Sequence, residues 1–257
     1  MLRPRLIPCL LLQQGGLVKT VQFKNPKYVG DPINAVKIFN EKEADELIFL
    51  DIDASRTNKE PDYKLIKQIA NECRMPLCYG GGIKILDQAK KIIQLGVEKI
   101  AISSTAVLNP QLITEMSKEI GSQSVVVVID VKYNMKSKSY NISILNNQKE
   151  INLNPLEFAK ECQSRGAGEI VLNFVDLDGA MEGYNIQFSQ QIINQLQIPL
   201  TILGGAGKLE HIKELYRNLG NCGAAAGSLF VFKGVYKAVL INYPEPEIKH
   251  DLMQVKI

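Results

Sequence analysis

Two glycine-rich segments of this sequence have a composition suited to binding phosphate. Pro76–Lys84 reads PLCYGGGIK and Pro199–Lys208 reads PLTILGGAGK, so each glycine cluster follows a short apolar run. Because glycine has no side chain, backbone N–H groups in such loops can approach phosphate oxygens closely. We therefore expect two phosphate sites, formed by Gly81, Gly82, Ser103, Ser104, Gly204, Gly205, Gly227 and Ser228. The alternative is that the glycines serve only tight turns.

These glycine segments belong to two similar halves of the chain. ADELIFLDID begins at Ala44, and AGEIVLNFVDLD begins at Ala167, 123 positions later. Such a repeat indicates a duplicated unit. Short apolar runs separated by segments with helical spacing favour a parallel α/β fold. Eight such runs are present, at 6–12, 47–51, 76–79, 99–102, 125–130, 170–174, 200–203 and 223–226.

Eight strands alternating with helices in 257 residues predict a (β/α)8 TIM barrel rather than an open doubly wound sheet. We expect one domain, 1–257, with half-barrels at about 1–120 and 121–243 and a tail at 244–257. The last barrel helix is expected near Gly234–Tyr243, and a hairpin-like insert at Lys132–Glu150 is expected to cover the mouth. In this architecture the loops after the carboxyl ends of the strands form the active site, which places the glycine segments there.

The composition is that of an ordinary globular protein. Hydrophobic residues make up 46% and charged residues 22%, and no apolar run approaches the roughly 18 residues needed to cross a bilayer. The run after Arg5 is short and lacks a cleavage signature, so we expect a cytoplasmic protein without a signal peptide or membrane contact. The net charge of +3 gives no reason to expect nucleic acid binding. Five scattered cysteines indicate reduced thiols, and no metal or cofactor is expected.

Across nearly its whole length the sequence resembles HisF, the cyclase subunit of imidazole glycerol phosphate synthase. The stretches that carry the resemblance are IPCL (7–10), VKTVQFKN (18–25), GDP (30–32), ADELIFLDI (44–52), GGGI (80–83), NPQLI (109–113), GSQSVVVVID (121–130), RGAGEI (165–170), DLDG (176–179) and GGAGKLEH (204–211). The resemblance implies a barrel that receives ammonia from a HisH-like class I glutaminase. It also implies that this ammonia attacks a bis-phosphorylated ribulosyl nucleotide.

The catalytic end departs from the pattern of that family. The family's chemistry implies two aspartates, and paired carboxylates suit a reaction that both removes and delivers protons. Here Asp130 ends the fifth strand, but Leu11 stands in the other position. Lys19 and Asp178 remain as possible catalytic groups. Asn173 and Phe174 replace small hydroxyl residues after the sixth strand, and the phenylalanine is expected to narrow the mouth of the active site. Ser103 and Ala180 also differ from the residues that are usual in the family. Without its partner, Asp130 could serve only to bond a loop backbone.

The opposite end keeps the charged residues that the family places around its ammonia entrance. These match Arg5, Glu46, Lys99 and Glu169, and such alternating charges can neutralise one another in a partly buried ring. The alternative is a purely structural plug. Glu98 matches a position that contacts the glutaminase in the family. Candidates for lining an ammonia path are Leu50, Cys78, Ile100 and Val126.

The resemblance is greatest to a second, divergent class of the family, found beside enzymes of surface-sugar biosynthesis. We therefore expect a subunit that channels ammonia to an ATP-dependent amidotransferase acting on a nucleotide sugar for a surface glycan of the lipopolysaccharide or O-antigen type, with its own cyclase activity lost or impaired. One alternative is a genuine cyclase of histidine biosynthesis with a relocated acid. The other is a non-catalytic scaffold that activates the glutaminase. The tail is either a flexible end or a docking segment for the amidotransferase.

Overall fold

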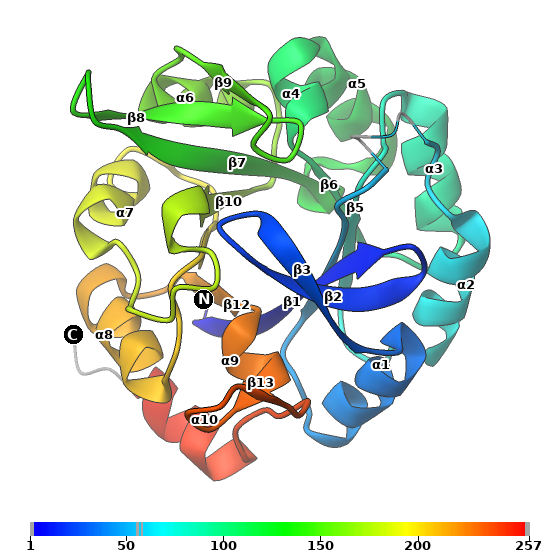
Figure 1. Ribbon diagram of the computed structural model, residues 1–257. Coiled ribbons are helices and arrows are strands. Elements are labelled where there is room, and N and C mark those ends of the chain that lie inside the picture. Colours follow the sequence, from blue (N-terminus) through cyan, green and yellow to red (C-terminus); the bar gives the residue numbers. More distant parts are fainter. Residues whose placement is uncertain (1–2, 55–56, 58, 255–257) are drawn as a thin grey trace.

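The chain folds as a closed parallel barrel surrounded by helices. A computed structural model describes residues 3–54, 57 and 59–254. Within them the barrel strands are β1 (Arg5–Gln13), β4 (Leu47–Asp51), β5 (Leu77–Gly80), β6 (Lys99–Ile102), β7 (Val125–Asn134), β10 (Glu169–Phe174), β11 (Leu200–Leu203) and β12 (Gly223–Ala226). Neighbouring strands pair in parallel around the circle, and β10 closes it on β7 (Figure 1). The predicted (β/α)8 barrel is confirmed.

Helices cover the outside of the barrel. They are α1 (Pro32–Glu41), α2 (Tyr63–Glu72), α3 (Leu86–Gln94), α4 (Ser104–Leu108), α5 (Gln111–Ile120), α6 (Pro155–Ser164), α7 (Ile186–Ile193), α8 (Leu209–Leu219), α9 (Ser228–Val231) and α10 (Pro246–Met253). The duplicated sequence is reflected in the start of α1 and α6. Asp31 and Asn154 each cap a helix whose first residue is proline, a position where the missing N–H costs nothing.

Alternation along the strands divides the apolar side chains into two cores. The outer core lies between the strands and the helices, whereas the inner core fills the barrel. The inner core consists of Ile7, Cys9, Ile48, Cys78, Ala101, Val126, Val128, Val171, Leu203 and Ala225, with Leu50 packed against it. Leu50, Cys78 and Val126 thus face inward, as expected of path-lining residues. The expectation for Ile100 was wrong, because its side chain belongs to the outer core.

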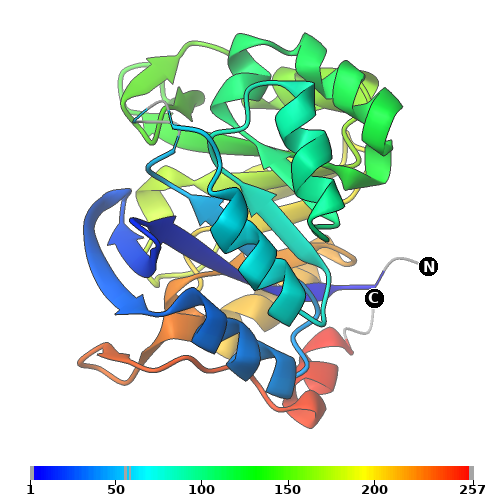
Figure 2. The ribbon, with the colours of Figure 1, turned by 90° about the vertical axis from the view of Figure 1, so that its right-hand side faces the viewer.

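Antiparallel hairpins extend from the carboxyl end of the barrel. Strands β2 (Gly16–Val21) and β3 (Lys24–Gly30) form one, and β7 continues beyond the barrel to pair with β8 (Ser139–Ile144). The short β9 (Lys149–Ile151) pairs with β8, so the predicted insert does contain two short strands. Viewed from the side, the hairpins project to the left, whereas the N-terminal end of the chain lies to the right (Figure 2).

The C-terminal region differs from the expectation. The expectation of a helix near Gly234–Tyr243 was wrong. Strand β13 (Phe232–Lys233) ends just before this stretch, which forms a turn and then strand β14 (Ala238–Val239), paired with β13. Gly234 and Lys237 adopt φ of 73° and 49°, which a right-handed helix does not allow. The last helix is α10, inside the expected tail, where Leu252 is buried and Lys249 bonds Asp45 at 3.0 Å. Most of the expected tail is therefore an ordered helix. Among the described residues, no helix is both long and apolar enough to span a membrane.

Candidate functional site

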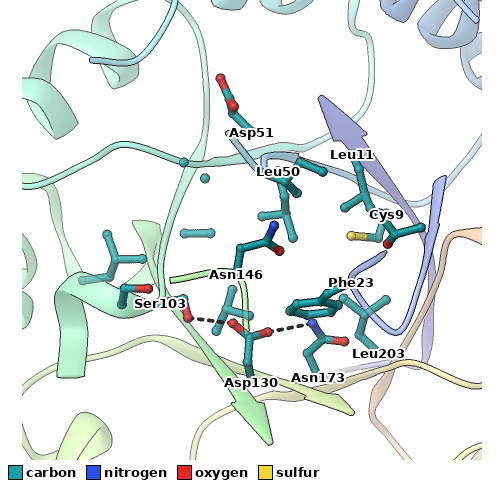
Figure 3. Close-up of a pocket in the computed structure, with 18 of the residues that line it drawn as sticks. Cys9, Leu11, Phe23, Leu50, Asp51, Ser103, Asp130, Asn146, Asn173 and Leu203 are labelled. Atoms are coloured by element: carbon teal, nitrogen blue, oxygen red, sulfur yellow. Dashed lines mark hydrogen bonds between the residues drawn. The ribbon is translucent and has the colours of Figure 1, made fainter. Parts of the chain in front are cut away.

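A pocket lies over the carboxyl ends of the barrel strands, where a TIM barrel places its active site (Figure 3). It encloses about 950 Å³, including the part open to solvent, and every barrel strand or the residue following it contributes to its lining. Its floor contains Cys9, Leu50, Ala101, Val128 and Leu203, all residues of the inner core or packed against it. The pocket is therefore continuous with the apolar interior of the barrel.

Asp130 accepts hydrogen bonds from two other pocket residues. Ser103 Oγ donates to its Oδ2 at 2.9 Å, and Asn173 Nδ2 donates to its Oδ1 at 2.7 Å. Burial raises the pKa of Asp130 to about 6, although the hydrogen bonds from Asn173 and Ser103 favour the ionised form. The alternative that Asp130 only bonds a loop backbone does not describe its contacts, because both partners are side chains. Asp130 can therefore exchange a proton near neutral pH.

Leu11 lies across the pocket from Asp130, in the wall formed by β1 and β4 (Figure 3). Asp51, at the end of β4, is another pocket carboxylate, which the sequence analysis did not select. Its Oδ1 accepts the backbone N–H groups of Asp53 and Ala54, both at 3.0 Å, so it shapes its own loop. Burial raises the pKa of Asp51, and those two N–H groups counteract the shift. Asp51 Oδ1 is therefore committed to the backbone of its own loop.

Lys19 and Asp178 form a buried ion pair that fixes the β2–β3 hairpin at the mouth. Thr20 Oγ1 donates to Asp178 Oδ2 at 2.7 Å, and the backbone N–H of Phe23 donates to the same oxygen at 3.2 Å. Both Asp178 oxygens are thus occupied. Gly227 makes room for this arrangement, because a Cβ there would lie 2.9 Å from Lys19 Cε.

The glycine segments differ in where they lie. Gly81, Gly82, Ser103 and Ser104 all line the pocket, so the structure brings the first predicted phosphate site together. Of the second, Gly227 lines the same pocket, and Ser228 lines an adjacent hollow together with Lys19 and other residues.

Gly204 and Gly205 line neither hollow. A Cβ at Gly204 would lie 2.8 Å from the Phe174 oxygen, and one at Gly205 would lie 1.9 Å from the Gly183 oxygen. These two glycines therefore allow close backbone packing, as the tight-turn alternative describes. Phosphate binding at either segment stays a prediction.

Phe174 does not narrow the mouth, contrary to expectation. Its side chain is buried in the outer core and makes edge contacts with Tyr140 and Phe188, with ring centroids 5.6 and 6.2 Å away. Neighbouring strand residues face opposite sides, so Asn173 points into the pocket and Phe174 points away. Two pocket residues that the sequence analysis missed, Phe23 and Asn146, come from loops whose sequence carries no periodic signal.

At the amino end of the barrel the four predicted gate residues form a closed ring. Arg5 donates to Glu46 at 2.5 Å and to Glu169 at 2.7 Å, and Lys99 Nζ bonds the same two carboxylates at 2.8 and 2.9 Å. Thr201 Oγ1 also donates to Glu169 at 2.6 Å. Glu46 and Glu169 are 3% and 4% exposed, so these charges are largely removed from water. We call Arg5, Glu46, Lys99 and Glu169 the charged ring.

The positive and negative groups of the charged ring stabilise one another's charged forms. Burial alone would raise the pKa of Glu169, but the charges of Arg5 and Lys99 outweigh it and hold that pKa below its usual value. Burial likewise acts to lower the pKa of Lys99, and the two glutamates reverse the shift. Glu169 and Lys99 therefore both keep their charges at neutral pH. Glu98, the predicted partner contact, accepts the backbone N–H of Leu77 at 2.8 Å, which is a structural role; contact with a partner stays a prediction.

The inner core lies between the charged ring and the pocket. Its side chains are aliphatic or small, and its two thiols are neutral, because burial raises the pKa of Cys9 to about 12 and that of Cys78 well above its usual value. A neutral small molecule would meet no charge among these inner-core side chains. A cation or an anion would have to lose its hydration without compensation.

Comparisons with known proteins agree with this arrangement. The family model described as Histidine biosynthesis protein matches residues 5–237. A protein of Leptospira borgpetersenii, provisionally named imidazole glycerol phosphate synthase subunit HisF, is 58% identical over 98% of this chain and 99% of its own length. One of Vibrio vulnificus, provisionally named hisF3, is 54% identical over 99% of this chain and 98% of its own. The HisF subunit of a Hydrogenobaculum species, named without that reservation, is 37% identical over the full length of both.

Proposed function

We propose, because this chain belongs to the HisF family of imidazole glycerol phosphate synthase subunits, that it is the ammonia-conducting barrel of a glutamine-dependent amidation complex. A HisH-like glutaminase binds at the charged ring and releases ammonia there. The ammonia passes through the inner core and leaves at the pocket. An ATP-dependent amidotransferase consumes it to amidate a nucleotide sugar used for a surface glycan.

The observation that carries this proposal is the contrast between the two ends of the barrel. At the pocket, Leu11 lies where a second carboxylate would be needed opposite Asp130. Acid–base chemistry at two substrate positions requires two proton-exchanging groups, and a leucine side chain exchanges none. At the other end, the charged ring has all four members and every carboxylate oxygen engaged. The machinery for admitting ammonia is thus intact, whereas the machinery for cyclisation is not.

The inner core supports the same reading. Ammonia released into neutral water becomes mostly ammonium, which has no free electron pair for attack on an electrophile. Passage through an apolar interior favours the neutral form, because an ammonium ion would be desolvated without a partner. Thr201, Arg5 and Lys99 lie at the amino end of this interior, and the inner core beyond them consists of apolar or small side chains.

The test is a reconstitution with candidate glutaminase and ATP-dependent amidotransferase subunits from the genome that encodes this chain. We expect a stable complex in which glutamine supports amidation of the nucleotide sugar. Lys99→Met should leave glutamine hydrolysis within about threefold but reduce glutamine-dependent amidation at least about tenfold, while amidation from added ammonium chloride persists. Equal amidation from glutamine in both proteins would mean that ammonia does not pass through this barrel.

A second candidate, imidazole glycerol phosphate cyclase activity, is favoured by Asp130 itself. Its pKa of about 6 suits a general acid or base, and Gly81 and Gly82 line the same pocket. Loss of one positioned acid or base usually lowers turnover about 10²- to 10⁴-fold. Turnover of the bis-phosphorylated substrate within about a hundredfold of an ordinary cyclase, with ammonium as nitrogen source, would favour this candidate over ammonia delivery.

A further inference from the structure

The hairpin formed by β13 and β14 exposes more apolar surface than its fold requires. Val235 and Tyr236 are 96% and 97% exposed, and Val239 and Leu240 are 43% and 47% exposed. The hairpin is held by its own turn, in which the Lys237 N–H donates to the Gly234 oxygen at 3.1 Å, and by a backbone bond from Leu240 to Val231. The four apolar side chains therefore cluster on the surface without contributing a core, which is typical of a contact site for another molecule.

Lysines surround this apolar cluster and recur on the other hairpins of the same end. Segments 16–30, 131–144 and 232–240, which we call the rim hairpins, contain no aspartate or glutamate. Their lysines are Lys19, Lys24, Lys27, Lys132, Lys136, Lys138, Lys233 and Lys237. Lys19 pairs with Asp178 and Lys132 with Glu150, but among the described residues the other six form no ion pair. A chain of net charge +3 thus gathers a local excess of positive charge at one end.

The rim hairpins stand around the mouth of the pocket. In Figure 1 they lie above, in front of and below the barrel axis, and in Figure 2 they project on the same side of the molecule. Two of them touch, because Lys27 Nζ donates to the Lys237 oxygen at 3.3 Å and lies 5.2 Å from the Phe232 ring centroid. A further apolar side chain, Met135, is 79% exposed at the tip of the β7–β8 hairpin. The combined surface encircles the exit that ammonia would use.

We propose that the rim hairpins are the docking surface for the enzyme that consumes the ammonia, which meets them with an acidic face carrying an apolar patch for Val235 and Tyr236. This inference rests on the proposed function, since it places the acceptor at the end opposite the glutaminase. An enzyme seated here covers the mouth and keeps the ammonia from bulk water. The lysines steer the encounter, and the apolar tips supply the buried contacts that hold the complex.

A protein occupant fits these residues better than a small ligand does. Val235, Tyr236 and Met135 do not line the pocket, so a molecule bound inside it would not touch them. A phosphorylated ligand would account for lysines but not for exposed valine, tyrosine and methionine. An anionic lipid surface could use both, and the experiment therefore includes one.

The experiment measures binding of the complex of this chain and its glutaminase to a purified candidate ATP-dependent amidotransferase from the same genome, by biolayer interferometry at several salt concentrations. Val235→Ser with Tyr236→Ser removes the apolar tips, and Lys233→Glu with Lys237→Glu reverses the charge. Lys67→Glu, an exposed lysine on α2, is the matched control. We expect Kd to rise about tenfold or more in both rim variants, with slower association and weaker salt dependence in the charge variant. The control should stay within about twofold.

Each outcome has a separate meaning. Unchanged binding in the rim variants, or no binding by the wild-type complex, overturns the docking surface. So does binding to vesicles of equal phosphatidylglycerol and phosphatidylcholine that the rim substitutions abolish while amidotransferase binding persists. If the wild-type complex amidates from glutamine and the rim variants do so equally, docking fails but ammonia delivery stands. If the wild-type complex binds the amidotransferase through the rim but amidates nothing, ammonia delivery fails and docking stands.

Discussion

Replacing Lys99 by methionine should destabilise the protein far more than removing an ordinary surface lysine. Lys99 donates two charge-assisted hydrogen bonds, at 2.8 and 2.9 Å, to carboxylates that are 3% and 4% exposed. Hydrogen bonds to charged groups contribute about 1.5–3 kcal/mol each. Arg5 would still pair with both glutamates, and methionine would not need desolvating. We therefore expect a net loss of about 3 kcal/mol, at the lower end of the range for a broken buried ion pair.

Lys90→Met is the matched control, because it also removes a lysine from a glutamate. Lys90 Nζ lies 2.5 Å from Glu119, but their side chains are 38% and 49% exposed. Exposed pairs of this kind contribute about 0–1 kcal/mol. Urea unfolding monitored by circular dichroism would compare the three proteins by midpoint and slope. A loss in Lys99→Met no larger than that in Lys90→Met would refute the description of the charged ring as a desolvated network.

The same ring fixes the expected pH dependence. The pKa of Glu169 is held below its usual value by Arg5 and Lys99, so the ring's contribution is present above the unfolded pKa of a glutamate and is lost as pH falls through the folded one. The difference in free energy of unfolding between wild type and Lys99→Met should therefore shrink below about pH 4. A difference that grew on acidification would contradict the assignment of an ionised Glu169.

Three further results are expected. If one missing proton-transfer group limits cyclase turnover, Leu11→Asp should raise it about a hundredfold above that of the wild-type chain, measured with the bis-phosphorylated substrate and ammonium. No gain would show that Leu11 is not the limiting change. Burial raises the pKa of Asp130 to about 6, so ionisation of this group opposes folding. The stability of the wild type should therefore fall relative to that of Asp130→Asn as pH rises from about 4 to 6. Urea midpoints that run parallel in the two proteins across that range would contradict the shift. Gly227→Ala places a Cβ 2.9 Å from Lys19 Cε and should speed hydrogen exchange in residues 19–23, whereas unchanged exchange would mean that the Lys19–Asp178 pair adapts.

The strands and their order were predictable because each is a short apolar run with a neighbour at a helical distance. Orientation within a strand was harder. Ile100 and Phe174 are as apolar as the residues that face the axis, and only the register of neighbouring strands puts them in the outer core. Near Gly234–Tyr243 the sequence is apolar enough for a helix. The positive φ of Gly234 and Lys237 decides for a hairpin there, and a pattern of hydrophobicity does not report it.

The candidate site was predictable where its residues end strands and obscure where they come from loops. Asp130 and Ser103 follow apolar runs, so the barrel architecture alone placed them at the mouth. The pairing of Lys19 with Asp178 joins residues 159 positions apart, and nothing local in either segment specifies it. The four members of the charged ring were identified through the resemblance to a family. Without it, only the equivalence of Glu46 and Glu169 in the two repeats would have suggested a shared location.

The charged ring also has a bearing on how the two halves of this chain depend on each other. Arg5, Glu46 and Lys99 come from the first half, whereas Glu169 comes from the second, so the ring divides into parts of charge +1 and −1. Cys78 and Thr201 occupy equivalent positions, each following a Pro–Leu pair in its repeat. Thr201 donates a hydrogen bond to Glu169, whereas Cys78 is a thiol within the inner core. The duplicated halves are therefore no longer interchangeable. Neutrality at the barrel's amino end belongs to the fused chain, because two copies of the first half would leave a net charge of +2 in the ring and two copies of the second half would leave −2.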